Sequence, residues 1–279
     1  MQPPIGLALV RDAEILGAEP YFHDLIVGIE EMTLIQGYPV LLRVLPSQQD
    51  ETTLYRSWAE ASLVSGVLLV DIQEADIRPQ LVVDLGLPAV VVGPPVDQQL
   101  MTVWTDDDAA MHLAVEYLIE QGHSEILHVG GPTHMRHSLS RRTALASTCE
   151  EGGVTARFAT GDYSRSSGRA ATSTALIEYP RVTAAVYDSD LMALGGLEAA
   201  EEAGVRVPDD LVVIAWDDST QAQLSTPSLS AIARDTRAVG RMIGQAMLDV
   251  LKGSPADLRH APAATLRVRT SSARDEPVT

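Results

Sequence analysis

Short, fully apolar runs alternate with longer segments of helical periodicity along most of this chain, and this alternation limits the fold more than any other feature. The run IGLALV at 5–10 precedes a helix-like segment at 21–36, and AVVV at 89–92 is a later run of the same kind. Strands that are apolar throughout are buried on both faces, and their alternation with helices is typical of a parallel α/β sheet. The sequence therefore predicts an α/β fold with helices covering both faces of its sheets.

The order of these elements also predicts how the chain is divided. Further strands are expected at 40–45, 66–70, 125–129, 157–160, 184–187, 211–216 and 265–268, and helices at 50–62, 75–85, 108–121, 136–151, 166–178, 191–203 and 236–252. Two similar βα series follow one another, which indicates two Rossmann-like subdomains with a ligand cleft between them. We assign 1–121 with about 236–260 to the N-terminal subdomain, 122–235 with about 261–272 to the C-terminal one, and 273–279 to a disordered tail.

Charge and cysteine content narrow the classes of partner and compartment. The chain has 20 Lys and Arg against 38 Asp and Glu, a net charge of −18. This acidity argues against direct binding of DNA or of an anionic membrane surface, since both rest on clustered cations. Cys149 is the single cysteine, so an internal disulfide is excluded and a reducing compartment is favoured. No apolar run approaches the ~20 residues of a membrane span, and no secretion signal is recognised, so we expect a cytoplasmic protein.

Signatures of catalysis and of metal binding are weak. The sequence has no G-x-S-x-G elbow, no P-loop, no paired-cysteine motif and no dinucleotide fingerprint after a strand, so we expect neither an enzyme nor a cofactor. The run Asp106-Asp107-Asp108 suits the start of a helix better than a cation site. The spacing His134-x-x-His137 suggests zinc, but no third ligand has a recognisable spacing. We therefore expect no metal site.

A series of motifs in fixed order carries a family resemblance. They are PYF at 20–22, GY at 37–38, VEYL at 115–118, GH at 122–123, GDYS at 161–164, DLMALG at 190–195, AGVRVPDD at 203–210, WDD at 216–218 and TP at 226–227. From about residue 5 to 269 this set resembles the effector-binding core of LacI-family transcriptional regulators, whose fold is shared with periplasmic sugar-binding proteins. Each motif alone is weak, and the ordered set is specific.

The resemblance implies a periplasmic-binding-protein-like type I fold and a sensor function. A small sugar-like effector would bind the core of a homodimer and allosterically control operator binding, with a repressor as the expected kind of regulator. Family members begin with a helix-turn-helix domain and a hinge helix, and nothing precedes the first core strand here. We expect that domain to have been removed rather than never to have existed. A solute-binding protein of a sugar transporter and a nucleoside-sensing regulator are the alternatives.

Three aromatic residues are expected at the ligand. The resemblance places Tyr21 and Phe22 after the first strand, at the cleft, and Tyr163 at the same cleft from the second subdomain. Aromatic faces suit the apolar face of a sugar ring or the plane of a base. Ordinary core packing is the alternative for Tyr21 and Phe22.

Charged residues complete the expected contacts. Arg141 matches the pocket arginine of the family, and its five donors can hold two hydroxyls or a carboxylate. Asp217 ends the strand at 211–216, where a carboxylate accepts hydrogen bonds from sugar hydroxyls. Asp218 is an alternative acceptor, or a cap of the next helix. The resemblance also places the loop that contains His137 near the ligand.

Three further positions complete the candidate site. The family pair Asn-Asp is Ser189-Asp190 here, so a hydroxyl replaces an amide. Asp190 binds the ligand, or it caps the helix that follows. Trp216 stands where a smaller or different aromatic residue is common in the family, and it lines the pocket or packs beneath it.

Overall fold

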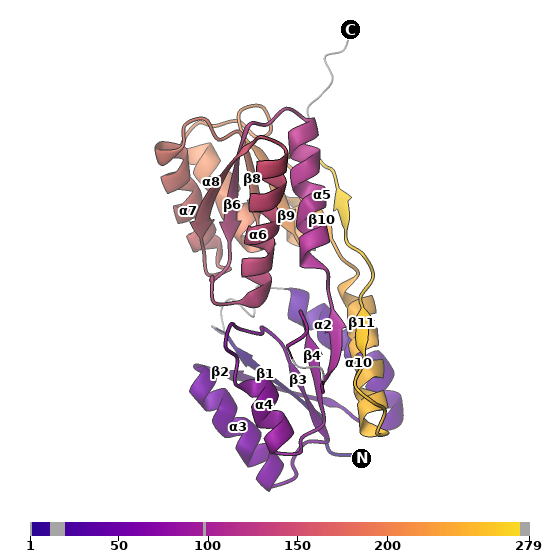
Figure 1. The fold of residues 1–279 in the computed structure, drawn as a ribbon. Helices are drawn as coiled ribbons and strands as arrows, with labels where there is room; N and C mark the ends of the chain where they lie inside the picture. Colours follow the sequence, from indigo (N-terminus) through magenta and orange to yellow (C-terminus); the bar gives the residue numbers. More distant parts are fainter. Residues whose placement is uncertain (1, 12–19, 97–98, 274–279) are drawn as a thin grey trace. The chain divides into compact units, whose positions relative to one another are not determined.

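Two compact units make up the chain in the computed structural model, which describes residues 2–11, 20–96 and 99–273 (Figure 1). Unit 1 comprises Met1–Asp106 with Asp235–Pro262, and unit 2 comprises Asp107–Arg234 with Ala263–Thr279. The helix at 107–120 therefore belongs to unit 2, whereas the sequence assigned it to the N-terminal subdomain. Its apolar face, which includes Met111, Val115 and Leu118, packs in the core of unit 2.

Unit 1 is built on one parallel sheet. In chain order its elements are β1 (Ile5–Val10), α2 (Pro20–Thr33), the 3₁₀ turn η1 (Leu34–Gln36), β2 (Val40–Leu45), α3 (Gln48–Glu60), β3 (Gly66–Leu69), α4 (Arg78–Asp84), β4 (Ala89–Val92), β5 (Met101–Trp104), α10 (Thr236–Leu251) and β11 (Leu258–His260). The strand order is β11-β5-β4-β3-β1-β2, and each of these neighbouring pairs is parallel. Because the strands alternate with helices, their carboxyl ends gather at one edge.

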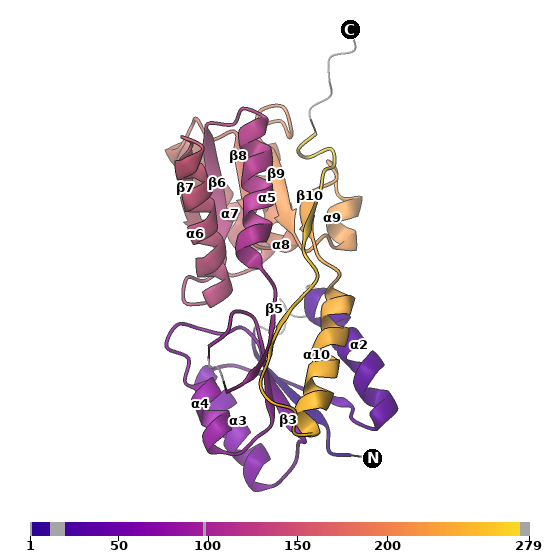
Figure 2. The ribbon, with the colours of Figure 1, turned by 45° about the vertical axis from the view of Figure 1, so that its right-hand side comes forward.

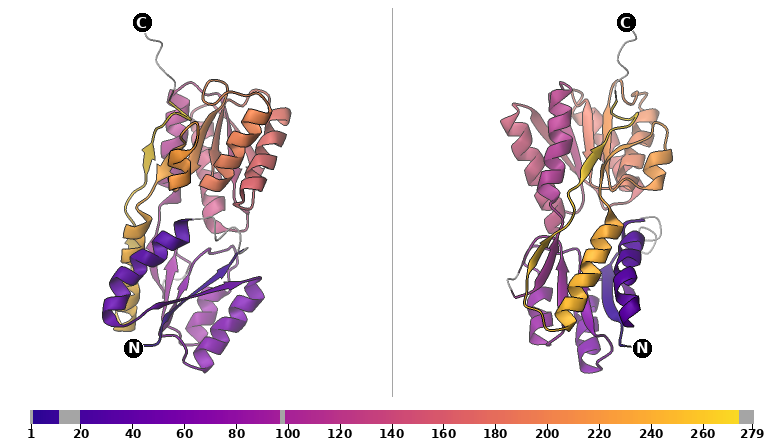
Figure 3. Two further views of the ribbon diagram at one scale, coloured as in Figure 1. Left: turned by 180° about the vertical axis from the view of Figure 1, so that it is seen from behind. Right: turned by 90° about the vertical axis from the view of Figure 1, so that its right-hand side faces the viewer.

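Helices cover both faces of this sheet. On one face, α2 and α10 lie side by side (Figures 2 and 3). Leu25, Ile29 and Ile243 of these two helices are buried in the core. On the other face, α3 and α4 bury Tyr55 and Trp58 against the alternate residues of the same strands. Successive strand residues point to opposite faces, which is why these strands are apolar throughout.

Glycines allow α2 and α10 to touch backbone to backbone. A Cβ atom at Gly28 would lie 2.2 Å from the carbonyl oxygen of Arg237, and one at Gly240 would lie 2.3 Å from that of Leu25. A larger residue at either position would force the helices apart, because packed interiors leave no such space.

Unit 2 repeats the design with one change at its edge. Its elements are α5 (Asp107–Glu120), β6 (Glu125–Gly130), α6 (Arg136–Glu151), β7 (Thr155–Thr160), α7 (Arg165–Glu178), β8 (Ala184–Tyr187), α8 (Asp190–Glu202), β9 (Val212–Trp216), α9 (Thr220–Leu224), β10 (Ser230–Ala233) and β12 (Thr265–Arg267). The strand order is β12-β10-β9-β8-β6-β7, with β12 antiparallel to β10 and the other pairs parallel. The predicted α/β class with two Rossmann-like sheets is confirmed.

Serine or aspartate caps five of the described helices. The side-chain oxygens of Ser47, Ser164, Ser189, Ser219 and Asp235 each accept a hydrogen bond from the backbone N–H three residues later. Such a cap stabilises a helix by about 1 kcal/mol. Ser164, Ser189 and Ser219 follow β7, β8 and β9, so these caps also shape the loops at the carboxyl edge of the unit 2 sheet.

Candidate functional site

The candidate residues of unit 2 gather at the carboxyl edge of its sheet. The loop after β6 leads to His137, and the loop after β7 carries Tyr163. The loop after β8 carries Ser189, the loop after β9 carries Asp217, and the same edge receives Arg141 from α6. In open parallel sheets this is the edge at which ligands bind. The structure thus brings residues that lie up to 80 positions apart in the sequence to one edge of one sheet.

Arg141 is buried and held on three sides. Its Nε and Nη2 donate to Asp107 Oδ1 at 3.1 and 3.0 Å, and its Nη1 donates to the carbonyl oxygen of Asp188 at 3.3 Å. Its guanidinium carbon lies 4.0 Å from the centroid of the Trp216 ring. Burial opposes the charge on Arg141, but the carboxylates of Asp107 and Asp188 outweigh it and raise the pKa above its ordinary range.

Asp107 joins a second arginine to this group. Arg234 follows β10 and donates from Nη1 to Asp107 Oδ1 at 3.1 Å and from Nη2 to Asp217 Oδ1 at 2.8 Å. Arg141, Asp107, Arg234 and Asp217 therefore form one chain of alternating charge. Asp217 is the most exposed carboxylate of that chain, with 22% of its side chain accessible, and its φ is +80°. It is the member best placed to meet a molecule from solution.

Asp188 anchors the turn after β6 from a fully buried position. Its Oδ1 lies 2.9 Å from His128 Nε2, and its Oδ2 accepts from the backbone N–H of Gly131 at 2.9 Å. Burial alone would raise the pKa of Asp188, but His128 and Arg141 hold it far below the usual range for a carboxyl group. Asp188 is therefore ionised, and it fixes the start of the loop that leads to α6.

Tyr163 lies over the same turn. Its hydroxyl is 2.8 Å from His137 Nε2 and 2.7 Å from Ser138 Oγ, and only 4% of the residue is exposed. A Cβ atom at Gly131 would lie 2.1 Å from that hydroxyl, so the ring rests directly on the backbone of the turn. Tyr163 and His137 thus form one packed pair, although His137 lies in the first turn of α6 and not in the loop expected from the sequence.

Asp190 and Ser189 take different roles at the start of α8. Ser189 is the N-cap, because its hydroxyl accepts from the N–H of Met192 at 3.2 Å, so the alternative that Asp190 caps this helix is wrong. Asp190 Oδ2 accepts from the N–H of Ser219 at 2.6 Å. Its Oδ1 is buried without a hydrogen-bond partner among the described residues. Burial raises the pKa of Asp190 to about 7, with Ser219 opposing and Asp217 adding to the rise.

Two of the sequence alternatives concern Trp216 and Asp218. Trp216 is fully buried, and its ring lies beneath Arg141 and 5.5 Å from the guanidinium carbon of Arg234. Asp218 accepts from Arg269 Nη1 and Nη2 at 2.6 and 3.0 Å. Of the two neighbouring aspartates, Asp217 is thus the one that takes part in the charge chain.

The two candidates in unit 1 lie in the first turn of α2. Phe22 is 2% exposed and belongs to the core of unit 1, while Tyr21 is partly buried and meets it edge to face at 5.1 Å. The guanidinium of Arg11, after β1, lies 5.4 Å from the Phe22 ring. Core packing therefore accounts for Phe22, and Tyr21 is the more accessible ring of the pair.

Three charged residues of the site were not foreseen: Asp107, Asp188 and Arg234. Asp107 was interpreted only as the start of a helix, and Asp188 directly precedes the Ser189-Asp190 pair without a motif of its own. Arg234 lies 127 positions from Asp107 in the sequence. The available signal was position: each of them directly follows a strand or begins a helix at the carboxyl edge of a sheet.

The other sequence candidates have ordinary surroundings in the structure. Cys149 is buried, and burial raises the pKa of its thiol to about 11. Asp108 contacts the hydroxyl of Ser140. Among residues 2–11, 20–96 and 99–273, no three His, Cys, Asp or Glu side chains are grouped as metal ligands would be. The helices of the described part are all too short or too polar to cross a bilayer.

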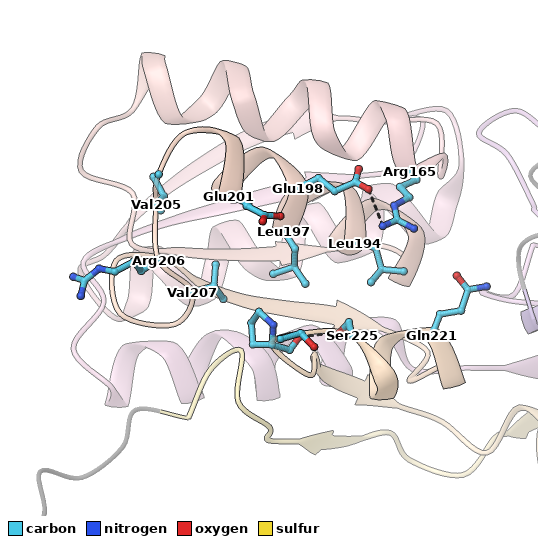
Figure 4. Close-up of a pocket in the computed structure, with 13 residues that line it drawn as sticks. Arg165, Leu194, Leu197, Glu198, Glu201, Val205, Arg206, Val207, Gln221 and Ser225 are labelled. Carbon is cyan, nitrogen blue, oxygen red and sulfur yellow. Dashed lines mark hydrogen bonds and ion pairs between the residues drawn. The ribbon is translucent and has the colours of Figure 1, made fainter.

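A separate groove of about 810 Å³ runs along α8 in unit 2 (Figure 4). Leu194 and Leu197 point into it from α8, and Ser225 lies on its opposite wall. An ion pair between Arg165 Nη2 and Glu198 Oε1, 2.7 Å apart, borders it. The groove does not include the residues of the charge chain.

Comparisons with known proteins show what the chain is similar to. The family of periplasmic binding protein-like domains matches residues 115–272, more than half of the chain. The transcriptional regulator CelR of Thermobifida fusca is 29% identical over 89% of this chain and 75% of its own length. The transcriptional repressor CytR of Escherichia coli strain K12 is 30% identical over 84% of this chain and 70% of its own length.

Solved structures give the same assignment. A LacI family transcriptional regulator from Bifidobacterium animalis subsp. lactis is 32% identical, with a TM-score of 0.89 and coverage of 97% of this chain and 98% of its own. A complex of the regulator CelR with cellobiose is 27% identical, with a TM-score of 0.90 and coverage of 97% and 85%.

Proposed function

Because this chain belongs to the LacI family of transcriptional regulators, we propose that it binds a carbohydrate effector at the carboxyl edge of the unit 2 sheet. Its relatives and structural neighbours are transcriptional regulators, so it is a ligand-sensing regulatory core and not an enzyme, as the sequence predicts. One observation carries the carbohydrate proposal: two carboxyl groups lie at the carboxyl edge of the unit 2 sheet. Asp217 is accessible, and Asp190 Oδ1 is buried without a hydrogen-bond partner among the described residues.

The contacts divide into groups that meet the effector and groups that hold them. We assign Asp190 and Asp217 as acceptors for effector hydroxyls, because charge-assisted hydrogen bonds to carboxylates are strong. Arg141 would donate to the effector while Asp107 fixes its plane and Trp216 supports it from beneath. His137 and Tyr163 would form the adjoining wall of the site. Ser189, at the start of α8, would be a further contact. Tyr21 is the proposed aromatic contact from unit 1, with Phe22 behind it.

A titration of the chain with carbohydrates tests this proposal. Neutral mono- and disaccharides, with cellobiose and ribose among them, and nucleosides as the alternative class, are screened by thermal shift and followed by calorimetry. A ligand at 100 times its Kd stabilises a protein by about 2.7 kcal/mol, a shift of several degrees. Binding of a saccharide is the expected result. Selective binding of nucleosides would replace the effector class, and an altered compound after incubation would contradict a sensor.

Two substitutions locate the effector. Asp217→Ala and Arg141→Ala are each expected to abolish binding while the chain remains folded, as checked by thermal unfolding. Arg169→Ala is the matched control, because Arg169 in α7 forms an exposed ion pair with Glu202 in α8 and is none of the residues assigned to the effector. Wild-type affinity in both site variants would refute the assignment.

We further propose that the chain forms a homodimer through the α8 groove and acts on operator DNA through a segment outside these 279 residues. The groove combines partly buried apolar side chains, such as Leu197 and Val205, with both signs of charge, from Arg165 and Arg206 and from Glu198 and Glu201. Such a surface can be complementary to itself across a two-fold axis. The net charge of −18 makes direct DNA binding by this chain unfavourable, which supports DNA contact through another segment. Effector binding would then shift the equilibrium between two states of the dimer.

A further inference from the structure

We infer that the effector of this chain bears hydroxyl groups but neither a phosphate nor a carboxylate group. The inference rests on the proposed carbohydrate-binding function and makes its ligand class narrower. It follows from how the charges at the carboxyl edges of both sheets are arranged, each sheet being considered by itself.

Arg141 and Arg234, the two arginines of the charge chain in unit 2, are already engaged by carboxylates. Arg141 donates twice to Asp107, and Arg234 bridges Asp107 and Asp217. Recognition of a phosphate or carboxylate by arginine needs the planar fork of donors to face the anion. An anionic effector would have to compete for these forks with carboxylates that are buried beside them.

The arginines at the carboxyl edge of unit 1 are engaged in the same way. Arg11 follows β1, and its Nη2 lies 3.1 Å from Asp71 Oδ2. Arg78 is 4% exposed and donates to Asp76 from Nε and Nη2 and to Glu51 from Nη1 at 2.8 Å. The positive charge of each guanidinium is already balanced by a neighbouring carboxylate, so neither is well placed to bind an anionic effector.

Acidic residues outnumber cations in the loops at these edges. The segments 161–164, 188–190 and 217–219, which follow β7, β8 and β9, contain five aspartates and no lysine or arginine. A second anion brought to such a site is repelled, because like charges at short range are unfavourable in the low dielectric of a protein.

The unpaired carboxyl oxygen at the site can be satisfied by a hydrogen-bond donor on the effector. Asp190 Oδ1 is a buried acceptor with no partner among the described residues, and an unpaired buried polar atom is costly. A sugar hydroxyl can donate to it, whereas a phosphate dianion or a carboxylate can only accept. Burial is the main cause of the raised pKa of Asp190, and the nearby charges of Asp217 and Asp218 add to the rise.

Matched pairs of saccharides test the inference with the full chain. Calorimetry compares cellobiose with cellobionate, lactose with lactobionate, glucose with glucose 6-phosphate and ribose with ribose 5-phosphate, at low salt and pH 8. For whichever pair contains a binding sugar, the neutral member is expected to bind about a hundredfold more tightly, equivalent to about 2.8 kcal/mol. Equal or tighter binding of an anionic member would overturn the inference while the carbohydrate proposal stands. Failure of every saccharide would overturn both.

A charge variant separates repulsion from poor shape. Asp218→Asn removes one negative charge next to Asp217 and leaves the groups assigned to the effector unchanged. We expect it to reduce, several-fold, the ratio between the Kd of the anionic saccharide and the Kd of its neutral partner. Asp84→Asn, at an exposed position of α4, is the control and should leave the gap unchanged. A gap that is the same in wild type and Asp218→Asn would contradict an electrostatic origin.

Discussion

Asp107 is the residue on which the geometry of the candidate site depends most. It accepts hydrogen bonds from both Arg141 and Arg234, and all three side chains are at most 7% exposed. Removing a carboxylate from such a group leaves buried cations without their main partner, which is far more costly than losing an ion pair at the surface. The site is therefore expected to be a structural element of unit 2 as well as a ligand contact.

The variant Asp107→Ala measures this dependence. We expect it to lower the free energy of unfolding by about 3 kcal/mol, since breaking a buried pair typically costs 3–5 kcal/mol. Glu202→Ala breaks the exposed pair with Arg169, whose side chains are 55% and 51% accessible, and should cost under about 1 kcal/mol. Urea denaturation of both variants gives the comparison, and equal losses would contradict the buried network.

Asp190 makes stability depend on pH. Its pKa is raised to about 7 in the folded chain, against about 3.9 in an unfolded one, so the folded state holds more protons between these values. This contribution to stability is complete below about pH 4 and is lost as the pH rises through 7. Urea denaturation at pH 5 and pH 8 should show that the free energy of unfolding declines less with pH in Asp190→Asn than in wild type. The control Asp84→Asn should show the same decline as wild type. An identical decline in Asp190→Asn would exclude Asp190 as its source.

Sequence alone could indicate which loops carry the site but not how their charges pair. Tyr163, Ser189, Asp190 and Asp217 were selected by motif, and each follows a strand at the carboxyl edge of unit 2. Pairing depends on contacts between distant positions, so the double role of Asp107 had no local signature. The contact of these residues with an effector stays a prediction.

The crossing of α2 and α10 depends on small residues. A Cβ atom at Gly240 would lie 2.3 Å from the carbonyl oxygen of Leu25, which is backbone and cannot rotate away. Gly240→Ala is expected to destabilise the chain by about 2 kcal/mol, in the range for overpacked cores. In the control Gly152→Ala, the nearest atom is the end of the Ile119 side chain at 2.6 Å, so a change under about 1 kcal/mol is expected. Thermal unfolding of both variants tests this, and a neutral Gly240→Ala would contradict the close crossing.

Elements with a uniform local pattern were predictable, and short elements without one were not. Strongly periodic helices such as α6 and uniformly apolar strands such as β4 have local signals that tertiary contacts reinforce. The strands β5, β10 and β11 and the helix α9 were missed, because each has only three to five residues and includes a polar residue that interrupts its apolar pattern. The chain changes unit shortly after β5, β10 and β11, so the boundary of unit 2 at Asp107 differs from the one that the sequence placed after residue 121.

The proposed dimer makes a prediction for the molecule as a whole. Leu224 in α9 is 79% exposed, and it precedes Ser225 at the wall of the α8 groove. We expect the wild-type chain to be a dimer by light scattering, and Leu224→Asp to be a monomer because a charge would be buried at the apolar contact. Ile177→Asp, at an equally exposed position on α7, should remain dimeric. A monomeric wild type would contradict dimerisation through this groove.

A crystal structure of the chain with the saccharide that gives the largest thermal shift would test the proposed site most directly. We expect density for the saccharide at the carboxyl edge of the unit 2 sheet. One of its hydroxyls should lie within hydrogen-bond distance of Asp217 and another within that distance of Asp190 Oδ1. A saccharide bound in the α8 groove instead, with both carboxylates untouched, would contradict the central claim.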